Sequence, residues 1–462
     1  MRVENRRKSR LRWSVSPTVS LPLLCVLLFV GGQVRAEDDV ARLEARIEAL
    51  EEQIRTLRDE LEKIRQAGRD RSVAPELEKP PAAAAEVGER GAALRSGDGS
   101  LVVRLRGYFQ ADSRVYLTED SFAGNDSFLM RRVRPVLELT AFRDFEFRVM
   151  PDFGGSSASL FDAYFNWRIA PVLQVRAGKM KSPTALERLQ SATALGFVER
   201  GLPTHLLPNR DVGVQIHGGF GRRLDYTVGL FNGTRDGGSS VTDGDDGKDL
   251  AVRVFAHPFR DRDDSPVKGL GIGIATTYGR HEGTPRGYAT TGQQDFFRFR
   301  TGVVNDGLIR RVSPQGYFYS GPAGVLWEWA QSSQELRLGG SRLTVRSRAW
   351  QILGSYMITG EDASFGAVRP HRNLGRGDGG WGALEVVARV GRLTVDESAF
   401  PILADPEAYA FQANGLGVGL NWYPNQFVKY TLDLGRTAFD NVPGGARKRP
   451  ENTLFSRVQF AF

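Results

Sequence analysis

The chain has few residues that could carry covalent or metal chemistry. It contains a single cysteine, Cys25, among 462 residues. Cys25 lies in an apolar run near the N-terminus, so the chain that remains once this run is removed has no thiol. Disulfides and thiolate metal sites are therefore excluded, and stability must come from size and architecture.

Enzyme signatures are also missing. No glycine-rich phosphate loop precedes a helix, and no His, Cys and Asp cluster has metal-ligand spacing. Of the five histidines only His217 lies plainly on a predicted strand, and no serine or acidic residue adjoins it. Outer-membrane barrels with hydrolase activity exist, so an enzyme stays an alternative. The prediction is that the chain is not an enzyme and uses no cofactor.

Long hydrophobic runs are absent too. The apolar run from Leu21 to Val30 follows a basic segment and precedes the small residues Val34 and Ala36. A spanning helix needs ~20 apolar residues, so this run is too short. Residues 1–36 are predicted to be a signal peptide cleaved after Ala36, with a membrane anchor as the alternative.

A heptad pattern follows the signal peptide. The apolar residues step alternately by three and four along residues 37–67, with charged residues elsewhere; they are Val40, Leu43, Ile47, Leu50, Ile54, Leu57, Leu61 and Ile64. This pattern predicts a coiled-coil helix, and the alternative is a helix packed on its own barrel. Residues 68–100, rich in Pro, Ala and Gly, are predicted to be a flexible linker.

From residue 101 to 462 the sequence alternates with a period of two. In LVVRLRGYFQADSRVYL, apolar side chains fall on one face, and arginine, glutamine and aspartate on the other. Similar runs recur, separated by turn-forming stretches. A barrel whose apolar face meets lipid and whose polar face lines water explains this pattern, and the alternative is a soluble β-sandwich or solenoid. The predicted fold is an all-β transmembrane barrel of about 16 antiparallel strands, a size that leaves an aqueous channel.

The C-terminus supports the same fold. The closing stretch TLFSRVQFAF alternates and ends on the aromatic Phe462. This ending resembles the signal that the barrel assembly machinery of the bacterial outer membrane recognises. We expect the chain to reside in that membrane, in contact with its lipid.

Arginines are placed on the polar face of the strands, often without an adjacent carboxylate. The stretch SFLMRRVRPVLELT holds Arg131, Arg132 and Arg134, and an earlier strand holds Arg104 and Arg106. Guanidinium groups in a water-filled tube would attract anions. A ladder of salt bridges to nearby carboxylates is the alternative. The net charge is +8, and the basic residues behind it are distributed along strands and do not cluster on one helix. No nucleic-acid partner is therefore expected.

From Leu101 to Phe462 the sequence resembles a known family. Its pieces appear in order as RGYFQAD, MRRVRP, FDAYFNW, AGKMKSPTALERLQSATALGFVER, PNRDVGVQIHG, YMITGE, LNWYPNQ and FSRVQFAF. Together they are similar to the phosphate-selective porin O and P family of outer-membrane anion channels. The resemblance implies a sixteen-stranded barrel, normally a homotrimer, whose third loop folds inward and narrows the pore.

The resemblance also implies a constriction site for the anion. The family's paired arginines correspond to Arg131 and Arg132, its constricting aspartate to Asp162, and its loop cations to Arg188 and Arg200. Neighbouring strand residues point to opposite faces, so Arg131 and Arg132 can both reach the pore only at a strand end or a bulge.

This chain departs from the family at three positions of the site. Arg134 replaces an aromatic residue, Lys181 replaces Tyr or Asp, and Tyr108 replaces an arginine, with Arg104 and Arg106 nearby. The function predicted is passive diffusion of phosphate, pyrophosphate or polyphosphate. The alternatives are a general anion porin, and a barrel whose coiled coil tethers the outer membrane to the cell wall.

Overall fold

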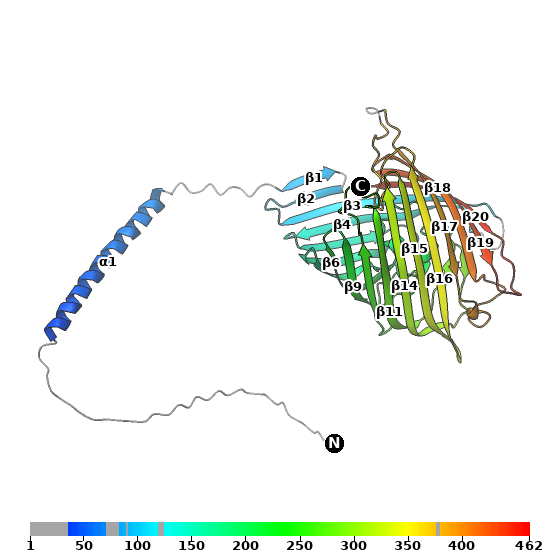
Figure 1. The fold of residues 1–462 in the computed structure, drawn as a ribbon, viewed down its shortest axis with the longest axis horizontal. Helices are drawn as coiled ribbons and strands as arrows, with labels where there is room; N and C mark the ends of the chain where they lie inside the picture. Colours follow the sequence, from blue (N-terminus) through cyan, green and yellow to red (C-terminus); the bar gives the residue numbers. More distant parts are fainter. Residues whose placement is uncertain (1–35, 71–82, 89–90, 119–123, 376–378) are drawn as a thin grey trace, which may run out of the picture. The chain divides into compact units, whose positions relative to one another are not determined.

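The computed structural model describes residues 36–70, 83–88, 91–118, 124–375 and 379–462. The predicted signal peptide therefore lies outside the described residues, except for Ala36. The chain divides into two units, residues 1–79 and 80–462, and the second contains the barrel (Figure 1).

The first unit contributes one helix, α1, from Ala36 to Asp70. The six seam residues whose side chains are described, from Ile47 to Ile64, are each at least half exposed. The helix agrees with the predicted 37–67 segment, whereas the coiled coil stays a prediction. None of the helices in the described residues is long and apolar enough to cross a lipid bilayer.

The second unit is built from one large antiparallel sheet. Its strands are β1 (Ala84–Gly88), β2 (Gly91–Arg95), β3 (Leu101–Tyr116), β4 (Ser127–Ala141), β5 (Phe145–Asp152), β6 (Ser159–Ala170), β7 (Leu173–Lys181), β8 (Arg210–Phe220), β9 (Leu224–Phe231), β10 (Asp249–Ala256), β11 (Leu270–Gly283), β14 (Val304–Ser320), β15 (Ala323–Leu338), β16 (Ser341–Met357), β17 (Ala383–Thr394), β18 (Gln412–Asn425), β19 (Val428–Asp440) and β20 (Glu451–Ala461). The shorter elements are α2 (Leu186–Leu189), η1 (Leu202–His205), β12 (Tyr288–Ala289), β13 (Asp295–Phe297) and η2 (Glu397–Ala399).

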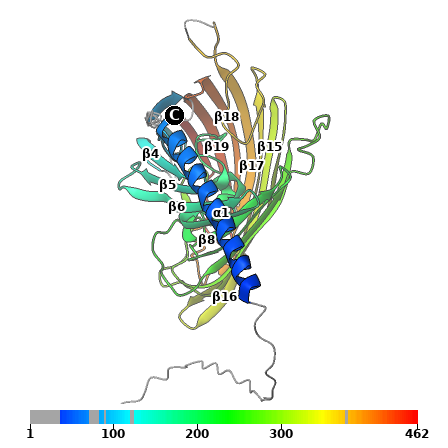
Figure 2. The same cartoon turned by 90° about the vertical axis from the view of Figure 1, so that its left-hand side faces the viewer.

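The sheet closes on itself. Strand β20 pairs with β3, from Thr453 opposite Tyr116 to Ala461 opposite Tyr108. Of the 18 strands in the described sheet, β1 and β2 form a side hairpin, which leaves 16 strands in the closed barrel. Figures 1 and 2 show these strands around one interior, with β4–β6 on one side and β15–β18 on the other. The predicted strand number is confirmed.

The hairpin β1–β2 differs from the predicted 68–100 linker. Strand β20 ends beside Gly107, whose backbone exchanges two hydrogen bonds with Phe462. The first residues of β3 therefore extend beyond β20 and would present an unpaired edge. Strand β2 pairs with them, from Ala92 opposite Leu105 to Arg95 opposite Val102. The hairpin thus provides hydrogen-bond partners for the backbone N–H and C=O groups at the start of β3. The sequence pattern did not show that these groups would lack a partner in β20.

The two ends of the barrel differ in their connections. At the end where the C-terminus lies, most connections are short turns, such as 171–172, 321–322 and 426–427. The opposite end carries the longer connections 182–209, 232–248, 284–303, 395–411 and 441–450. Short turns face the periplasm in outer-membrane barrels, so we term the C-terminal end periplasmic and the other end extracellular.

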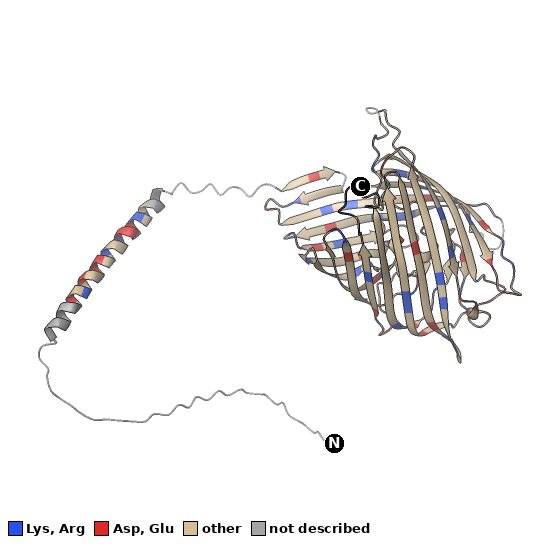
Figure 3. Cartoon of the chain, viewed as in Figure 1, with Lys and Arg blue, Asp and Glu red and all other residues tan. Residues whose placement is uncertain are grey.

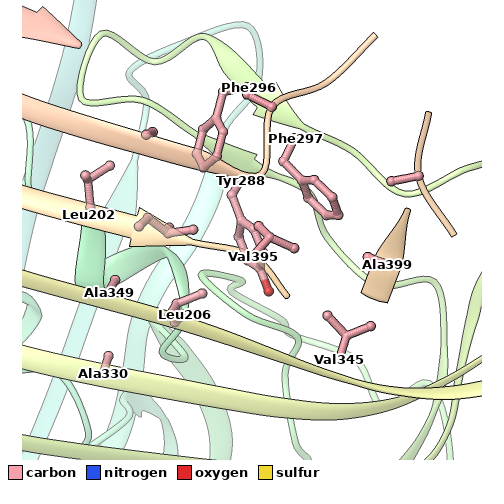
Figure 4. Close-up of a cluster of buried hydrophobic side chains, with 14 of the residues drawn as sticks. Leu202, Leu206, Tyr288, Phe296, Phe297, Ala330, Val345, Ala349, Val395 and Ala399 are labelled. Carbon is pink, nitrogen blue, oxygen red and sulfur yellow. The ribbon is translucent and has the colours of Figure 1, made fainter. Parts of the chain in front are cut away.

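Part of the interior is apolar, which the alternation did not predict. The extracellular connections 284–303 and 395–411 fold inward and pack, together with Leu202 and Leu206, against the inner wall of β15–β19. Small wall residues such as Ala330 and Ala349 belong to this cluster and lie near Leu206, while the rings of Phe296 and Phe297 form another part of it (Figure 4). This cluster fills the interior beside β15–β19, so the polar path lies nearer to β3–β10.

Candidate functional site

A bulge in β4 brings two adjacent arginines to the interior. In the pairing of β3 with β4, Gln110 lies opposite Arg132 and Ala111 lies opposite Met130. Arg131 is thus one extra residue on β4. Both Arg131 and Arg132 line the same cavity inside the barrel. The bulge is the geometry that their adjacency in the sequence required.

Glu199 is the carboxylate around which these arginines gather. Its Oε1 accepts from Arg131 Nε at 2.5 Å and Arg114 Nη2 at 2.8 Å, and its Oε2 accepts from Arg131 Nη2 at 3.1 Å. Arg132 and Arg457 each lie 3.9 Å from a Glu199 oxygen. Burial alone would raise the pKa of Glu199, but the guanidinium groups of Arg131 and Arg132 outweigh it and hold the pKa well below its usual range.

A second bulge places Asp162. The pairing of β5 with β6 skips Phe161, so Phe161 and Asp162 both line the cavity. Asp162 Oδ1 accepts from Arg210 Nε at 2.8 Å, and its Oδ2 lies 3.4 Å from Arg148 Nε. Asp162 is therefore paired with two arginines, Arg210 and Arg148, neither of which was among the predicted site residues.

Arg134 is also neutralised. Its Nη2 lies 2.7 Å from Asp152 Oδ2, and its Nη1 donates to the Tyr108 hydroxyl at 2.8 Å. The guanidinium stacks over the Phe161 ring at 3.7 Å from the centroid, and Arg210 lies over the same ring at 4.5 Å. Stacking and pairing fix the orientation of both guanidinium groups.

Residues 182–209, between β7 and β8, contact strands far around the barrel. Glu328 of β15 accepts from the Leu186 N–H at 2.7 Å, and Asp433 of β19 accepts from the Val198 N–H at 2.5 Å. Side chains of β14, β16, β17, β18 and β20 also hydrogen-bond to this segment. The Phe197 ring lies 3.0 Å from where a Cβ on Gly417 would be, so glycine in β18 permits this close approach.

Four cations around this segment differ from the paired arginines, because they donate to backbone carbonyls. Lys181 donates to the carbonyls of Leu189 and Gln190 at 3.0 and 3.1 Å, and Arg200 donates to those of Glu187 and Gln190 at 2.9 and 3.1 Å. Arg188 donates twice to the Thr204 carbonyl, at 2.5 and 3.1 Å. Arg286 donates to the Gly237 carbonyl at 2.9 Å. None of the four forms an ion pair with a carboxylate in the described part of the chain. Burial, with Arg188 and Arg286 nearby, lowers the pKa of His205 to about 3, so this histidine adds no charge near neutral pH.

These residues surround a cavity of about 290 Å³. Its cationic lining residues are Arg131, Arg132, Arg134, Arg148, Lys181, Arg188, Arg200, Arg210 and Arg286, and its acidic ones are Asp162 and Glu199. The excess of cations makes the cavity strongly positive. Figure 3 shows basic and acidic residues scattered along the strands of the barrel, among residues of other kinds.

Arg104 and Arg106 lie apart from this cavity. Arg106 forms an ion pair with Glu138, and Arg104 lines a second cavity, of about 350 Å³, at the periplasmic end. The hairpin adds Arg95 to the same cavity, and the turn after β4 adds Arg143. Five arginines and two carboxylates line this cavity, so its lining is basic; they are Arg95, Arg104, Arg143, Arg148, Arg168, Glu138 and Glu146.

A periplasmic connection also enters the interior. Residues 358–382 join β16 to β17, and the described part carries Phe365, whose ring stacks on Tyr317 with centroids 5.1 Å apart. The Phe365 carbonyl accepts from Gln190 Nε2 at 3.0 Å. This connection therefore touches segment 182–209 from the periplasmic side.

The structure thus brings together seven of the predicted site residues and separates two. Arg131, Arg132, Arg134, Asp162, Lys181, Arg188 and Arg200 line one cavity, and Arg104 and Arg106 do not. Arg106, Arg131, Arg132 and Arg134 each lie within 4.0 Å of a carboxylate, so these four follow the alternative of salt bridges to carboxylates. Arg148, Glu199, Arg210 and Arg286 also line the cavity and were not among the predicted site residues. Only the adjacency of Glu199 to Arg200 offered a signal.

Comparisons with known proteins agree with this architecture. Residues 103–462 match the family model described as phosphate-selective porin O and P. The outer membrane channel DcaP of Acinetobacter baumannii has a similar structure, with 12% identity, a TM-score of 0.53 and coverage of 79% of this chain and 98% of that chain. OmpF of Salmonella typhi aligns with 10% identity, a TM-score of 0.50 and the same coverage values. No curated protein sequence matches the chain.

Proposed function

Because the chain belongs to the phosphate-selective porin O and P family, we propose that it forms a water-filled outer-membrane channel for the passive diffusion of anions, with phosphate and pyrophosphate bound best. Family and fold favour a channel over an enzyme. A closed barrel with an apolar outer face supports the bacterial outer membrane as its location.

The observation that carries the proposal is the set of cations without carboxylate partners. Lys181, Arg188, Arg200 and Arg286 keep their positive charge available to a solute, because carbonyl oxygens hold them in place without neutralising them. Guanidinium forks match the oxygen geometry of phosphate. The ion-paired arginines around Glu199 and Asp162 provide a rigid frame for these four.

We propose further that segment 182–209 is the inward loop that narrows the channel. Its contacts with β14–β20 carry it across the interior, and the apolar cluster behind it fills the space beside β15–β19. Solutes would then pass between the loop and the wall formed by β3–β8, where the two bulges present Arg131 and Asp162.

The preference among anions follows from the charge at the constriction. Lys181 adds a cation to the cavity, while Arg134 is balanced by Asp152. The net addition relative to the family pattern therefore comes from Lys181, and it is one positive charge where the family carries Tyr and two where it carries Asp. Such a site favours a more highly charged anion, so pyrophosphate should bind more tightly than phosphate.

The first test is the reversal potential of the purified mature protein in a planar bilayer under a KCl gradient. We expect the sign that corresponds to chloride permeation. Potassium preference would contradict the proposal. The second test is block of the chloride current, where pyrophosphate should reach half-block at a lower concentration than phosphate. Equal half-block concentrations would remove the proposed preference and leave a general anion porin.

We also propose that the channel is a homotrimer, that the assembly machinery recognises Phe462, and that α1 associates as a coiled coil. The exposed seam of α1 supports the last point. Native mass spectrometry of the detergent-solubilised protein with and without residues 37–67 would separate trimerisation by the barrel from trimerisation by the helix. A monomer in both cases would contradict the trimer.

A further inference from the structure

Outward-facing arginines of the described strands gather on one part of the barrel. We define the outer arginine row as the exposed residues Arg310 of β14, Arg346 and Arg348 of β16, Arg392 of β17 and Arg436 of β19. Pairing places Arg310 and Arg346 at the same register on either side of β15, since Ser333 lies opposite both. In Figure 3, blue segments lie on neighbouring front strands of the barrel.

The row has a constant height across four strands. Arg310 precedes Phe318 by eight residues, and Arg348 precedes Tyr356 by eight. Arg392 and Arg436 likewise follow Leu384 and Val428, on β17 and β19, by eight residues. The four reference residues, Phe318, Tyr356, Leu384 and Val428, lie near the periplasmic ends of their strands. The arginines therefore lie on one level near the extracellular end, although the strands are tilted.

This level coincides with the edge of the lipid-facing band. The outward residues between the arginines and the strand ends are apolar, such as Ile352, Val390 and Leu434, which are 47%, 42% and 50% exposed. Eight strand residues rise about 26 Å along the strand, and a tilt of ~40° reduces this to roughly 20 Å of height. A long arginine side chain then reaches the upper border of an apolar band ~25 Å tall.

The guanidinium groups of the row are oriented but not neutralised. Arg348 donates to Gln331 at 3.0 Å, Arg392 to Asn414 at 2.6 Å and Arg436 to Asn452 at 3.3 Å. Arg310 stacks over Tyr278 at 5.5 Å. Two acidic groups lie close to the row. Asp440 accepts from Gln412 and Asn414, and Asp396 accepts from the backbone N–H of Arg346 at 3.4 Å.

Arginines farther from the band are different. Arg337 and Arg342 both pair with Asp306, at 2.5 and 2.7 Å. An ion pair therefore forms where the chain provides a carboxylate. In the row each guanidinium keeps donors free at the depth where lipid head groups lie.

We propose that the outer arginine row binds the phosphate groups of lipid head groups in the extracellular leaflet. The ligand class is a phosphorylated lipid, because its phosphates would meet the guanidinium forks while its acyl chains cover the apolar residues below. This inference depends on the membrane location of the barrel and not on the ion that the channel conducts.

The experiment uses the full mature protein in detergent, titrated with diphosphoryl lipid A and followed by native mass spectrometry. The variant Arg348→Gln with Arg392→Gln should bind it on the order of 25-fold more weakly, from a factor of about five per arginine. The matched control, Arg337→Gln with Arg342→Gln, should change binding less than twofold. Phosphatidylcholine should bind all three proteins equally and weakly.

Two results would overturn the proposal. One is equal affinity of the two double variants for diphosphoryl lipid A. The other is displacement of the lipid by inorganic phosphate at the same concentration, which would make the row a general anion patch. Unchanged chloride conductance and unchanged heat-modifiability in gels verify that the variants fold. A porin that conducts cations could still bind the lipid, so this test and that of the channel function fail independently.

Discussion

Replacing Glu199 by Gln removes one negative charge from the cavity that this residue lines and leaves the volume of the side chain almost unchanged. In the folded chain this carboxylate accepts from Arg131 and Arg114 and lies 3.9 Å from Arg132 and Arg457. Arg457 and Arg114 have a further carboxylate nearby, Asp112, at 2.6 and 3.7 Å, whereas Arg131 and Arg132 have no second ion pair among the described residues. The variant therefore releases guanidinium charge toward the channel, and we expect tighter anion binding.

The size of the gain follows from Coulomb's law. For an anion roughly 8 Å from the lost carboxylate, the repulsion removed is about 0.5 kcal/mol in water and about 2 kcal/mol at an effective dielectric constant of ~20. These energies correspond to a half-block concentration of phosphate lower by a factor of roughly 2 to 30. Glu146→Gln, near the periplasmic end and paired with Arg168 at 3.2 Å, is the matched control and should leave half-block within twofold.

The pH dependence has a fixed sign. Because the pKa of Glu199 is lowered, its carboxylate is charged at every pH above 4.5, the ordinary pKa of glutamate. The charge and the stability that it contributes are lost only as the pH falls through the lower pKa of the folded state. The Glu199 contribution to stability is thus constant from pH 5 to 8. Strong acid should make the unmodified protein resemble the variant in phosphate affinity.

Stability provides a second readout. Removing one partner of a buried ion pair leaves uncompensated charge, which is strongly destabilising. The thermal midpoint of Glu199→Gln should therefore fall in phosphate-free buffer and recover when phosphate is added. A folded variant with unchanged or weaker phosphate block would refute the reasoning, because it would mean that Glu199 does not oppose the anion.

Three further predictions concern other parts of the chain. The double variant Lys181→Gln with Arg200→Gln should raise the half-block concentration of phosphate by an order of magnitude or more, because each charge removed costs about 1 kcal/mol of attraction in a solvated pore. The control variant Arg106→Gln should leave the half-block concentration unchanged. Replacing residues 362–371 by a short glycine linker should raise single-channel conductance without reversing ion preference, because Phe365 then no longer contacts Gln190; unchanged conductance would place the connection outside the path. A peptide of residues 36–70 should show helicity by circular dichroism that rises with concentration, and Ile54→Asp should abolish that rise; concentration-independent helicity would contradict the coiled coil.

Much of the fold could be predicted from local pattern. The period of two and the length of the segment after residue 100 predicted the strand number, because each strand must present an apolar face to lipid. Even the bulge in β4 was foreseeable, since Arg131 and Arg132 are adjacent and both needed to reach water. These features depend on residues that are neighbours in the sequence.

The partners of the charges could not be predicted in this way. Glu199 meets Arg131 and Arg457 from strands far away in the sequence, and Asp236 meets Arg311 over 75 residues at 2.7 Å. Such pairs depend on barrel register and on the path of the loops. The hairpin β1–β2 was missed for a related reason: nothing in its own residues shows that β20 ends early and leaves an edge of β3 to cover.

In the proposed channel, the backbone contacts of the loop cations would connect folding with selectivity. Lys181 and Arg200 both donate to the Gln190 carbonyl, so the interactions that hold segment 182–209 in place also fix the charges proposed to bind the anion. An anion at these cations competes with the carbonyls for the same donors. Its binding free energy is thus reduced by the cost of loosening the loop, and the site stays weak enough for release, as conduction requires. If so, a variant with a second loop anchor beside Gln190 should bind phosphate more tightly and conduct it more slowly.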